Sequence, residues 1–228
     1  VLLPEYINRL VEKGLNGINL SLDTLNKSKF KKITRREGLD KVLEGLFLAI
    51  NSGIQSIKVN VVAMKDFNDD EISDFVELTK DNNITVRFIE LMPFDSHQIW
   101  KTGKFFRSDQ IVKYLKSHYE GLQPVTGSST EHFIFNIKDY IGRVAVIPSY
   151  TRSLCGACNR IRITADGKLL NCLYSQKETN IRDAIRTGMS DTEIKDLILF
   201  AMQKKLKDGW VAQNQGEDSR ESMTQIGG

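Results

Sequence analysis

The chain has 228 residues, of which 32 are lysine or arginine and 29 are aspartate or glutamate, giving a formal net charge of +3. A charge this small does not favour a nucleic-acid or membrane-surface binder, and no apolar run approaches the roughly 18 residues that span a membrane. The cysteines number only three, and the first residues show no signal-peptide pattern. An odd number of cysteines argues against a closed disulfide framework, so we expect a cytoplasmic protein.

Helices and strands alternate over the first part of the chain. Apolar residues at helical spacing predict helices, and alternating or continuous apolar runs predict strands. Strands that alternate with helices are typical of parallel βαβ units. In chain order we predict a helix (4–14), a strand (18–23), a polar linker (24–38), a helix (42–50), a strand (57–62), a helix after caps at 68–71, and a strand (84–91).

Polar residues share one face of the first two predicted strands. Asn19, Ser21 and Asp23 alternate along the first strand, and Lys58 and Asn60 alternate along the second. A parallel strand covered by helices on both sides would be apolar throughout. The pattern therefore favours a face that meets a cavity, as in a barrel whose lumen binds ligands, over a solvent-exposed edge strand.

The rest of the chain has a different character. A loop and one helix (108–116) lead to a polar stretch at 126–130, which predicts a boundary. We therefore predict an α/β partial barrel over 1–125, followed by a small α+β extension over 126–228. Within the extension the predicted elements are short strands at 132–137, 143–147, 160–164 and 168–173, and a helix at 191–207.

The three cysteines form a cluster with the spacing C-x2-C-x13-C. Cys155 and Cys158 flank a tight turn, and Cys172 returns on a hairpin whose predicted turn is Asp166-Gly167. With a two-residue turn, Ile161 would lie across from Cys172, and a small bend would bring the three thiolates to one point. The spacing therefore predicts a metal centre.

The spacing alone does not choose the metal. A structural zinc site needs a fourth ligand, for which His132 is the candidate, whereas three cysteines on an iron–sulfur cluster leave one iron open. A redox pair of the CxxC type would leave Cys172 unexplained. Arg160 and Arg162 lie two apart on one predicted strand, so they would either bind a phosphate or carboxylate together or form a solvated strand face.

Several stretches also occur in one fixed order. They are NLSLDT at 19–24, KVNVV at 58–62, RFIELMP at 87–93, CGACNRIRITADG at 155–167 with a cysteine at 172, and the terminal glycine pair at 227–228. In this order they resemble the GTP 3′,8-cyclases, the molybdenum-cofactor biosynthesis protein A family of radical S-adenosylmethionine (SAM) lyases. The resemblance extends over essentially the whole chain.

This resemblance implies a role for each matched residue. It implies that Cys155, Cys158 and Cys172 hold a [4Fe–4S] cluster whose open iron binds the guanine part of GTP. It further implies that Ser21 and Met92 contact SAM, and that GTP is contacted by Lys58, Arg87, Arg160 and Arg162. The implied catalytic residues are Arg160, Arg162, Gly227 and Gly228, and the two glycines would lie on a tail that reaches into the active site.

The family's fold and reaction follow from the same resemblance. We expect the last three strands of a (βα)6 TIM-like barrel, followed by the cluster-binding extension. In the family, a radical derived from SAM takes the 3′ hydrogen of GTP, and C3′ attacks C8 to give 3′,8-cyclo-7,8-dihydro-GTP. The implied partners are GTP, SAM, an electron donor, the downstream cyclic pyranopterin monophosphate synthase and a second copy in a homodimer.

One departure from the family pattern is large. No cysteine precedes Cys155, so the family's C-x3-C-x2-C loop for the SAM-binding cluster is not in this sequence. Because the chain also begins at Val1, we expect a fragment that lacks the N-terminal part and does not cleave SAM alone. Two alternatives stay open: another radical-SAM enzyme with an auxiliary cluster, and a zinc-stabilised binding module.

Overall fold

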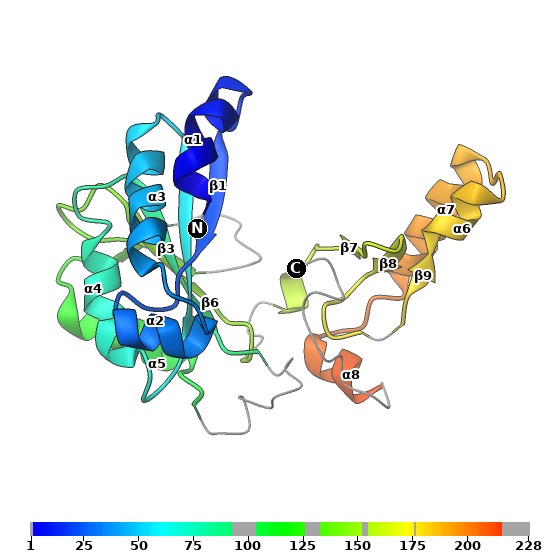
Figure 1. Cartoon of the computed structure of the whole chain (residues 1–228). Helices are drawn as coiled ribbons and strands as arrows, with labels where there is room; N and C mark the ends of the chain where they lie inside the picture. Colours follow the sequence, from blue (N-terminus) through cyan, green and yellow to red (C-terminus); the bar gives the residue numbers. More distant parts are fainter. Residues whose placement is uncertain (1, 93–103, 126–132, 152–154, 176, 216–228) are drawn as a thin grey trace. The chain divides into compact units, whose positions relative to one another are not determined.

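The computed structural model describes residues 2–92, 104–125, 133–151, 155–175 and 177–215. The chain is mixed α/β and divides into two compact units (Figure 1). The first unit comprises 1–91 and 103–151, and the second comprises 92–102 and 152–228. Among the described helices, none has the length and apolar character needed to cross a bilayer.

The first unit is built on a six-stranded sheet. Its strands, in chain order, are β1 (Gly17–Ser21), β2 (Ser56–Ala63), β3 (Ile84–Glu90), β4 (Gln123–Pro124), β5 (Phe133–Asn136) and β6 (Arg143–Ile147). The spatial order is β1-β2-β3-β6-β5-β4. β1, β2, β3 and β6 are parallel, whereas β5 and β4 continue the sheet in antiparallel pairs. The predicted parallel βαβ arrangement is therefore confirmed.

Helices connect these strands. They are α1 (Leu3–Glu12), α2 (Lys27–Thr34), α3 (Leu39–Asn51), the short η1 (Asp69–Glu71), α4 (Ile72–Glu77) and α5 (Ser108–His118). The predicted helices are confirmed, but α2 lies in the stretch predicted to be a linker. Asn26 caps α2, because its side chain accepts hydrogen bonds from the backbone N–H groups of Ser28 and Lys29. Phe30 is the buried residue of this helix.

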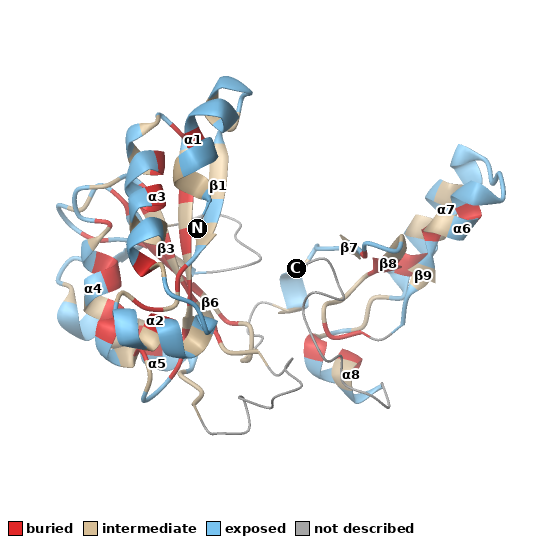
Figure 2. Cartoon of the chain, in the orientation of Figure 1, coloured by how far each residue is buried: buried red, intermediate tan, exposed pale blue. Residues whose placement is uncertain are grey.

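Alternate residues of β2 and β3 are buried, as the sequence pattern predicts. Val59, Val86 and Val144 occupy matched positions on neighbouring strands and are 0% exposed. They belong to the core cluster that also holds the inner residues of the helices (Figure 2). Each fully buried valine or leucine side chain contributes about 1.5–3 kcal/mol, so this face holds the unit together. On the opposite face, the residues of β1, β2 and β3 are half-buried or exposed, whereas Ala145 of β6 is buried.

β6 differs from the sequence prediction, which puts residues 143–147 in an extension beginning at 126. In the structure β6 pairs in parallel with β3, so the parallel part has four strands and the first unit continues to Thr151. Gly142 permits this pairing. A Cβ there would lie 2.4 Å from the carbonyl oxygen of Ile84 and 2.5 Å from that of Asn82.

The second unit contains a small antiparallel sheet and three helices. Its elements are η3 (Cys155–Ala157), β7 (Arg162–Ile163), β8 (Lys168–Leu170), β9 (Thr179–Asn180), α6 (Ile181–Arg186), α7 (Asp191–Gln203) and α8 (Gly209–Asn214). Leu169, Ile181 and Ala201 form its buried core. The helix predicted at 191–207 is confirmed as α7, while α6 and α8 are additional.

The hairpin of β7 and β8 has a different register from the one predicted. Arg162 pairs with Leu170, and the backbone N–H of Thr164 donates to the carbonyl of Lys168 at 2.9 Å. The loop therefore has three residues, and its last one, Gly167, has a φ of +79°, which favours glycine. The Thr164 hydroxyl accepts from the Lys168 N–H and donates to the Asp166 carboxylate. The predicted two-residue turn is wrong by one position.

Candidate functional site

The polar face of β1, β2 and β3 gathers three of the residues predicted to bind ligands. The register pairs Asn19 with Lys58, Ser21 with Asn60, and Asn60 with Arg87. Paired residues in a sheet point to the same side, so Ser21, Lys58 and Arg87 lie on one face of adjacent strands. Asn19 and Ser21 are exposed, and the other three are half-buried.

Arg87 is tied to this face by its side chain. Its Nε donates to Oδ1 of Asn60 at 2.7 Å, and its Nη2 donates to Oδ1 of Asn19 at 3.1 Å. Along its own strand Arg87 shares a face with Ile89, so the sequence of β3 alone does not show that the face is polar. The neighbouring strands supply the polar partners.

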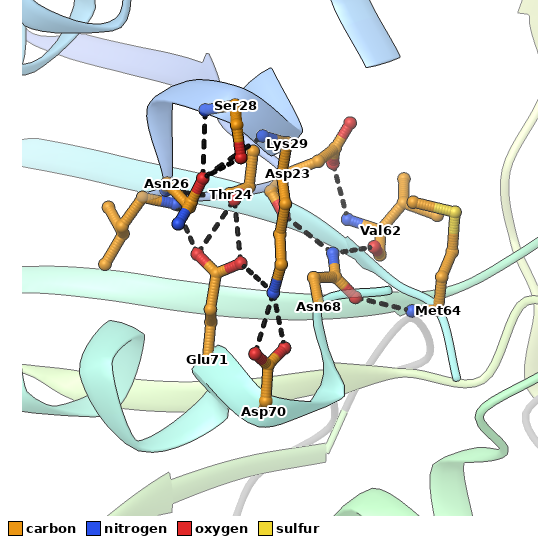
Figure 3. Close-up of polar contacts among 11 residues, drawn as sticks. Asp23, Thr24, Asn26, Ser28, Lys29, Val62, Met64, Asn68, Asp70 and Glu71 are labelled. Atoms are coloured by element: carbon orange, nitrogen blue, oxygen red, sulfur yellow. Dashed lines mark hydrogen bonds and ion pairs between the residues drawn. The ribbon is translucent and has the colours of Figure 1, made fainter. Parts of the chain in front are cut away.

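A buried amide links the carboxyl ends of β1 and β2. Asn68 is 2% exposed. Its Nδ2 donates to the carbonyl oxygens of Asp23 at 2.6 Å and Val62 at 2.9 Å, and its Oδ1 accepts from the Met64 N–H at 2.8 Å (Figure 3). Every polar atom of the amide thus has a partner, which fixes the chain just beyond Ser21.

A buried carboxylate holds the loop that follows. Glu71 accepts from the Thr24 hydroxyl at 2.8 Å and from the Leu25 N–H at 2.6 Å. The Lys29 ammonium lies between Glu71, at 2.8 Å, and Asp70, at 2.6 Å (Figure 3). Because Glu71 is 6% exposed, its bonds to Thr24 and Leu25 are shielded from water, whereas Asp70 lies at the surface. The bonds of Glu71 fix the loop after β1 onto η1.

The Asp23 carboxylate belongs to the same network, where it accepts from the Val62 N–H at 2.8 Å. Burial raises the pKa of Asp23, and the hydrogen bond from Val62 opposes this rise without cancelling it. The folded chain therefore holds this proton more tightly than the unfolded chain. Ionisation of Asp23 therefore lowers the free energy of unfolding. This loss develops as the pH rises from the ordinary aspartate pKa of 3.8 through the higher pKa of the folded chain.

We expect Asp23→Asn to raise the melting temperature at neutral pH, because it removes a largely desolvated charge while keeping an oxygen for the Val62 N–H. The difference from the parent chain should shrink as the pH falls through this window and vanish below it. Thermal denaturation at a series of pH values measures the effect. A lower melting temperature for the variant at neutral pH would mean that the charge supports the fold.

The cysteine segment begins with the tight turn η3, in which the Cys158 N–H donates to the Cys155 carbonyl at 3.1 Å. Cys155, Cys158 and Cys172 are all half-buried and none is in a disulfide. Over the described residues, no group of three or more His, Cys, Asp and Glu side chains is already gathered in metal-binding geometry. The predicted convergence of the three cysteines is therefore not formed among the described residues. His132, the candidate zinc ligand, lies outside the described residues.

Lys205, just beyond α7, contacts this segment. Its ammonium donates to the carbonyl oxygens of Cys158 at 2.7 Å and Arg160 at 3.0 Å, and lies 3.5 Å from the Cys158 sulfur. Burial alone would raise the pKa of Cys158. The backbone N–H of Arg160, the positive charge of Lys205 and the Arg160 side chain together outweigh burial, so this pKa lies below its ordinary value. Cys158 therefore forms the thiolate, which is the form that binds metals, more readily than an ordinary cysteine does.

Replacing Lys205 with methionine removes this charge while keeping a long side chain. We expect the Cys158 pKa to rise and its alkylation by iodoacetamide at neutral pH to slow severalfold, whereas Lys205→Arg should retain the parent rate. Peptide-resolved mass spectrometry of the metal-free chain measures the rate, with Cys172 as the internal control. An unchanged Cys158 rate in the methionine variant would contradict the role of Lys205.

The other predicted site residues lie at the ends of strands, outside strands, or outside the described part of the chain. Arg162 begins β7 and is half-buried, whereas Arg160 is exposed and precedes the strand, so the two do not share a strand as predicted. Met92 is half-buried, lies beyond the end of β3 and belongs to the second unit. Gly227 and Gly228 lie outside the described residues.

Comparison with known proteins distinguishes the GTP 3′,8-cyclase resemblance from the two alternatives, another radical-SAM enzyme and a zinc-stabilised binding module. Residues 1–79 match the Radical SAM superfamily, and residues 84–210 match the family described as Molybdenum Cofactor Synthesis C. A GTP 3′,8-cyclase of Chlorobaculum tepidum is 42% identical over 228 residues, which cover 100% of this chain and 68% of that protein. The chain belongs to the GTP 3′,8-cyclase family.

Other members of the GTP 3′,8-cyclase family match this chain at a similar level of sequence identity. One from Alkaliphilus oremlandii is 40% identical over 229 residues, covering 100% of this chain and 70% of that protein. The mouse protein named Molybdenum cofactor biosynthesis protein 1 is 41% identical over 205 residues, covering 89% of this chain and 32% of that protein. The resemblance drawn from the motifs is confirmed, and the family is one of enzymes rather than binding modules.

The two matched regions divide the candidate residues of this GTP 3′,8-cyclase family member. The radical-SAM region holds Ser21 and Lys58, and the second region holds Arg87, the cysteines and Lys205. The donor chemistry of the cysteine segment fits an iron–sulfur cluster, because its three thiols are outside any disulfide and the pKa of Cys158 is lowered. The sequence had no local signal for Lys205, which is 47 residues from its sulfur partner.

Proposed function

We propose that this chain carries the GTP-binding part of a GTP 3′,8-cyclase, which converts GTP to 3′,8-cyclo-7,8-dihydro-GTP by SAM-derived radical chemistry. The observation that carries the proposal is the pairing of two features in one chain. The first unit has a polar strand face bearing Lys58 and Arg87, and the second unit has a segment that combines three thiols with two arginines. The relatives that span the whole chain bear this enzyme's name.

The parallel strands are proposed to form part of a (βα)6 barrel, and the second unit its cluster-binding extension. The strand order supports this, as does a sheet with one face buried against helices and one polar. In barrels of this kind, ligands bind at the carboxyl ends of the strands. The Asn68 and Glu71 networks fix the carboxyl ends of β1 and β2, where such a ligand would bind.

Ser21 and Met92 are proposed to contact SAM, and Lys58 and Arg87 to contact GTP. The Ser21 hydroxyl is exposed at the carboxyl end of β1, so it is placed to donate to a bound ligand. Lys58 and Arg87 bring two cations to one face, as a triphosphate requires.

Cys155, Cys158 and Cys172 are proposed to hold a [4Fe–4S] cluster in the second unit. With three protein ligands, such a cluster offers an open iron position to substrate when it is bound. The nearby arginines and the terminal glycines would act on GTP at this position, the proposed catalytic residues being Arg160, Arg162, Gly227 and Gly228. The proposed partners are an electron donor, the downstream cyclic pyranopterin monophosphate synthase and a second copy of the chain.

Anaerobic reconstitution with iron and sulfide, followed by titration with GTP, tests this function. We expect a brown protein whose absorption spectrum changes saturably as GTP is added, and we expect Cys155→Ala to abolish both the colour and the change. A colourless protein that holds one tightly bound zinc, and whose GTP binding is indifferent to Cys155→Ala, would instead indicate a zinc-stabilised module.

A further inference from the structure

The end of α7 contacts the stretch of chain that bears Cys158. Lys205 follows the last turn of this helix and is half-buried. Its ammonium donates to the carbonyl oxygens of Cys158 at 2.7 Å and Arg160 at 3.0 Å, and it lies 3.5 Å from the Cys158 sulfur. One ammonium thus fixes the backbone on both sides of Asn159 and places a positive charge beside the sulfur.

The same end of α7 also contacts the stretch that bears Cys172. The last carbonyl groups of a helix have no partner within it. One of them, the carbonyl of Ala201, accepts from Nδ2 of Asn171 at 2.7 Å, and Asn171 directly precedes Cys172. The Ala201 side chain is 4% exposed and belongs to the same buried core as Leu169 of β8. A hydrogen bond and apolar packing therefore both tie this stretch to the helix.

We propose that Lys205 and Asn171 are positioning residues, which hold the Cys158 and Cys172 stretches on the end of α7 so that the second unit binds its iron–sulfur cluster. This inference rests on the proposed function, because that function supplies the cluster. The cysteines come from separate parts of the segment, and one helix end contacts both parts. Their backbone is therefore set in place before a cluster binds.

Hydrogen–deuterium exchange of the metal-free chain tests this role without the cluster. We expect Lys205→Met to speed exchange severalfold in residues 155–163, and Asn171→Ala to speed it severalfold in residues 170–175, because each removes a contact that closes its stretch. Lys205→Arg keeps a donor and a charge, so it should keep the parent rates. Exchange in α6 should be the same in all variants, which separates local loosening from unfolding of the second unit.

Lys204→Met is the matched control for the loss of charge. Lys204 is exposed and directly precedes Lys205. Its ammonium lies over the Phe200 ring, 5.1 Å from the ring centroid, and the substitution removes the same charge from the same helix end. We expect this variant to keep the parent exchange rates in both cysteine stretches.

Redox titration of the reconstituted chain gives a readout that a merely structural role would not move. Lys205→Met should have a more negative midpoint potential, because a positive charge beside a ligand sulfur stabilises the added electron. We expect a roughly tenfold change in the equilibrium constant for one-electron reduction, which corresponds to about 59 mV. Lys205→Arg and Lys204→Met should keep the parent potential, and Asn171→Ala should lose iron to a chelator severalfold faster than the parent.

Two results would overturn the inference. One is parent-like exchange in both Lys205→Met and Asn171→Ala, because the end of α7 would then not set the cysteine stretches. The other is a midpoint potential in Lys205→Met that equals that of the parent chain or is reproduced by Lys204→Met, because the Lys205 ammonium would then have no particular place beside Cys158.

The two experiments separate this inference from the proposed function. If the parent chain binds no iron–sulfur cluster, the proposed function fails, while exchange in the metal-free chain still decides whether α7 positions the two stretches. If the parent chain binds the cluster and GTP but exchange is the same in all variants, the positioning role fails while the function stands.

Discussion

Glu90→Ala is expected to lower the free energy of unfolding of the first unit by roughly 3 kcal/mol or more, since each buried donor left without an acceptor costs about 1–3 kcal/mol. Glu90 ends β3 and is 1% exposed. Its carboxylate accepts from the backbone N–H groups of Tyr150 and Thr151, both at 2.7 Å, and from that of Ser108. It thereby joins the carboxyl end of β3 to the start of α5 and to the segment after β6.

Urea denaturation measures this loss as a lower midpoint at an unchanged slope. Glu90→Gln keeps one acceptor oxygen, so its loss should be intermediate. Glu37→Ala is the matched control, because Glu37 is exposed and pairs only on the surface with Lys31, where such a pair is worth at most about 1 kcal/mol. If Glu90→Ala were as stable as Glu37→Ala, water would have to replace the carboxylate as acceptor.

This anchor also bears on the site. Glu90 and Arg87 lie on the same strand, and Glu90 points to the buried face while Arg87 points to the polar one. If Arg87 contacts GTP as proposed, loosening the end of β3 should weaken GTP binding through the position of Arg87. The effect should be smaller than the loss of Arg87 itself, because Asn60 and Asn19 still hold the guanidinium.

The alternation of helices and parallel strands could be predicted because it depends on local patterns. Apolar residues recur every second position in β2 and β3, and burial follows them. α2 was missed because its lysine-rich sequence has one buried residue, Phe30, although the Asn26 cap was a usable signal. Helix propensity and the Asn26 cap stabilise α2 without the wide apolar stripe that makes a helix visible in a sequence.

The errors further along the chain arise from contacts that no local pattern encodes. β6 joins the sheet through β3, which is more than fifty residues earlier, and the sequence shows only a short apolar run. The hairpin register depends on the Thr164 hydroxyl and on the positive φ of Gly167, which select a three-residue loop where Asp-Gly suggests a two-residue turn.

The residues of the candidate site also fall into two groups, those that a sequence motif nominates and those that only the fold reveals. The sequence motifs nominate Ser21, Lys58 and Cys158 as candidate ligand-binding residues. The supporting residues could not be chosen from the sequence, because Asn60 acts on Arg87 across strands and Lys205 acts on Cys158 from the far end of α7. Supporting residues are found only when the fold brings them beside their partners.

Arg160→Ala and Arg162→Ala are each expected to weaken GTP binding by roughly 10- to 100-fold, since a hydrogen bond to a charged group contributes about 1.5–3 kcal/mol. Lys205 fixes the carbonyl oxygens of Cys158 and Arg160, so the cysteine and the arginine are held at a set separation. If the cysteine holds the cluster that receives the guanine, the arginines beside it are placed to hold the rest of the nucleotide.

Titration of each reconstituted variant with GTP and with guanosine measures the effect. A contact to the phosphates predicts a large loss for GTP and little for guanosine, whereas a contact to the base predicts equal losses. Arg182→Ala is the matched control, because it removes the same charge from the second unit at a residue already paired with Asp183. Arg162 is half-buried, so its replacement could also affect folding. The melting temperature of Arg162→Ala must therefore match that of Arg182→Ala before a loss of GTP affinity is attributed to binding. Equal GTP affinities in all three variants would remove both arginines from the proposed GTP site.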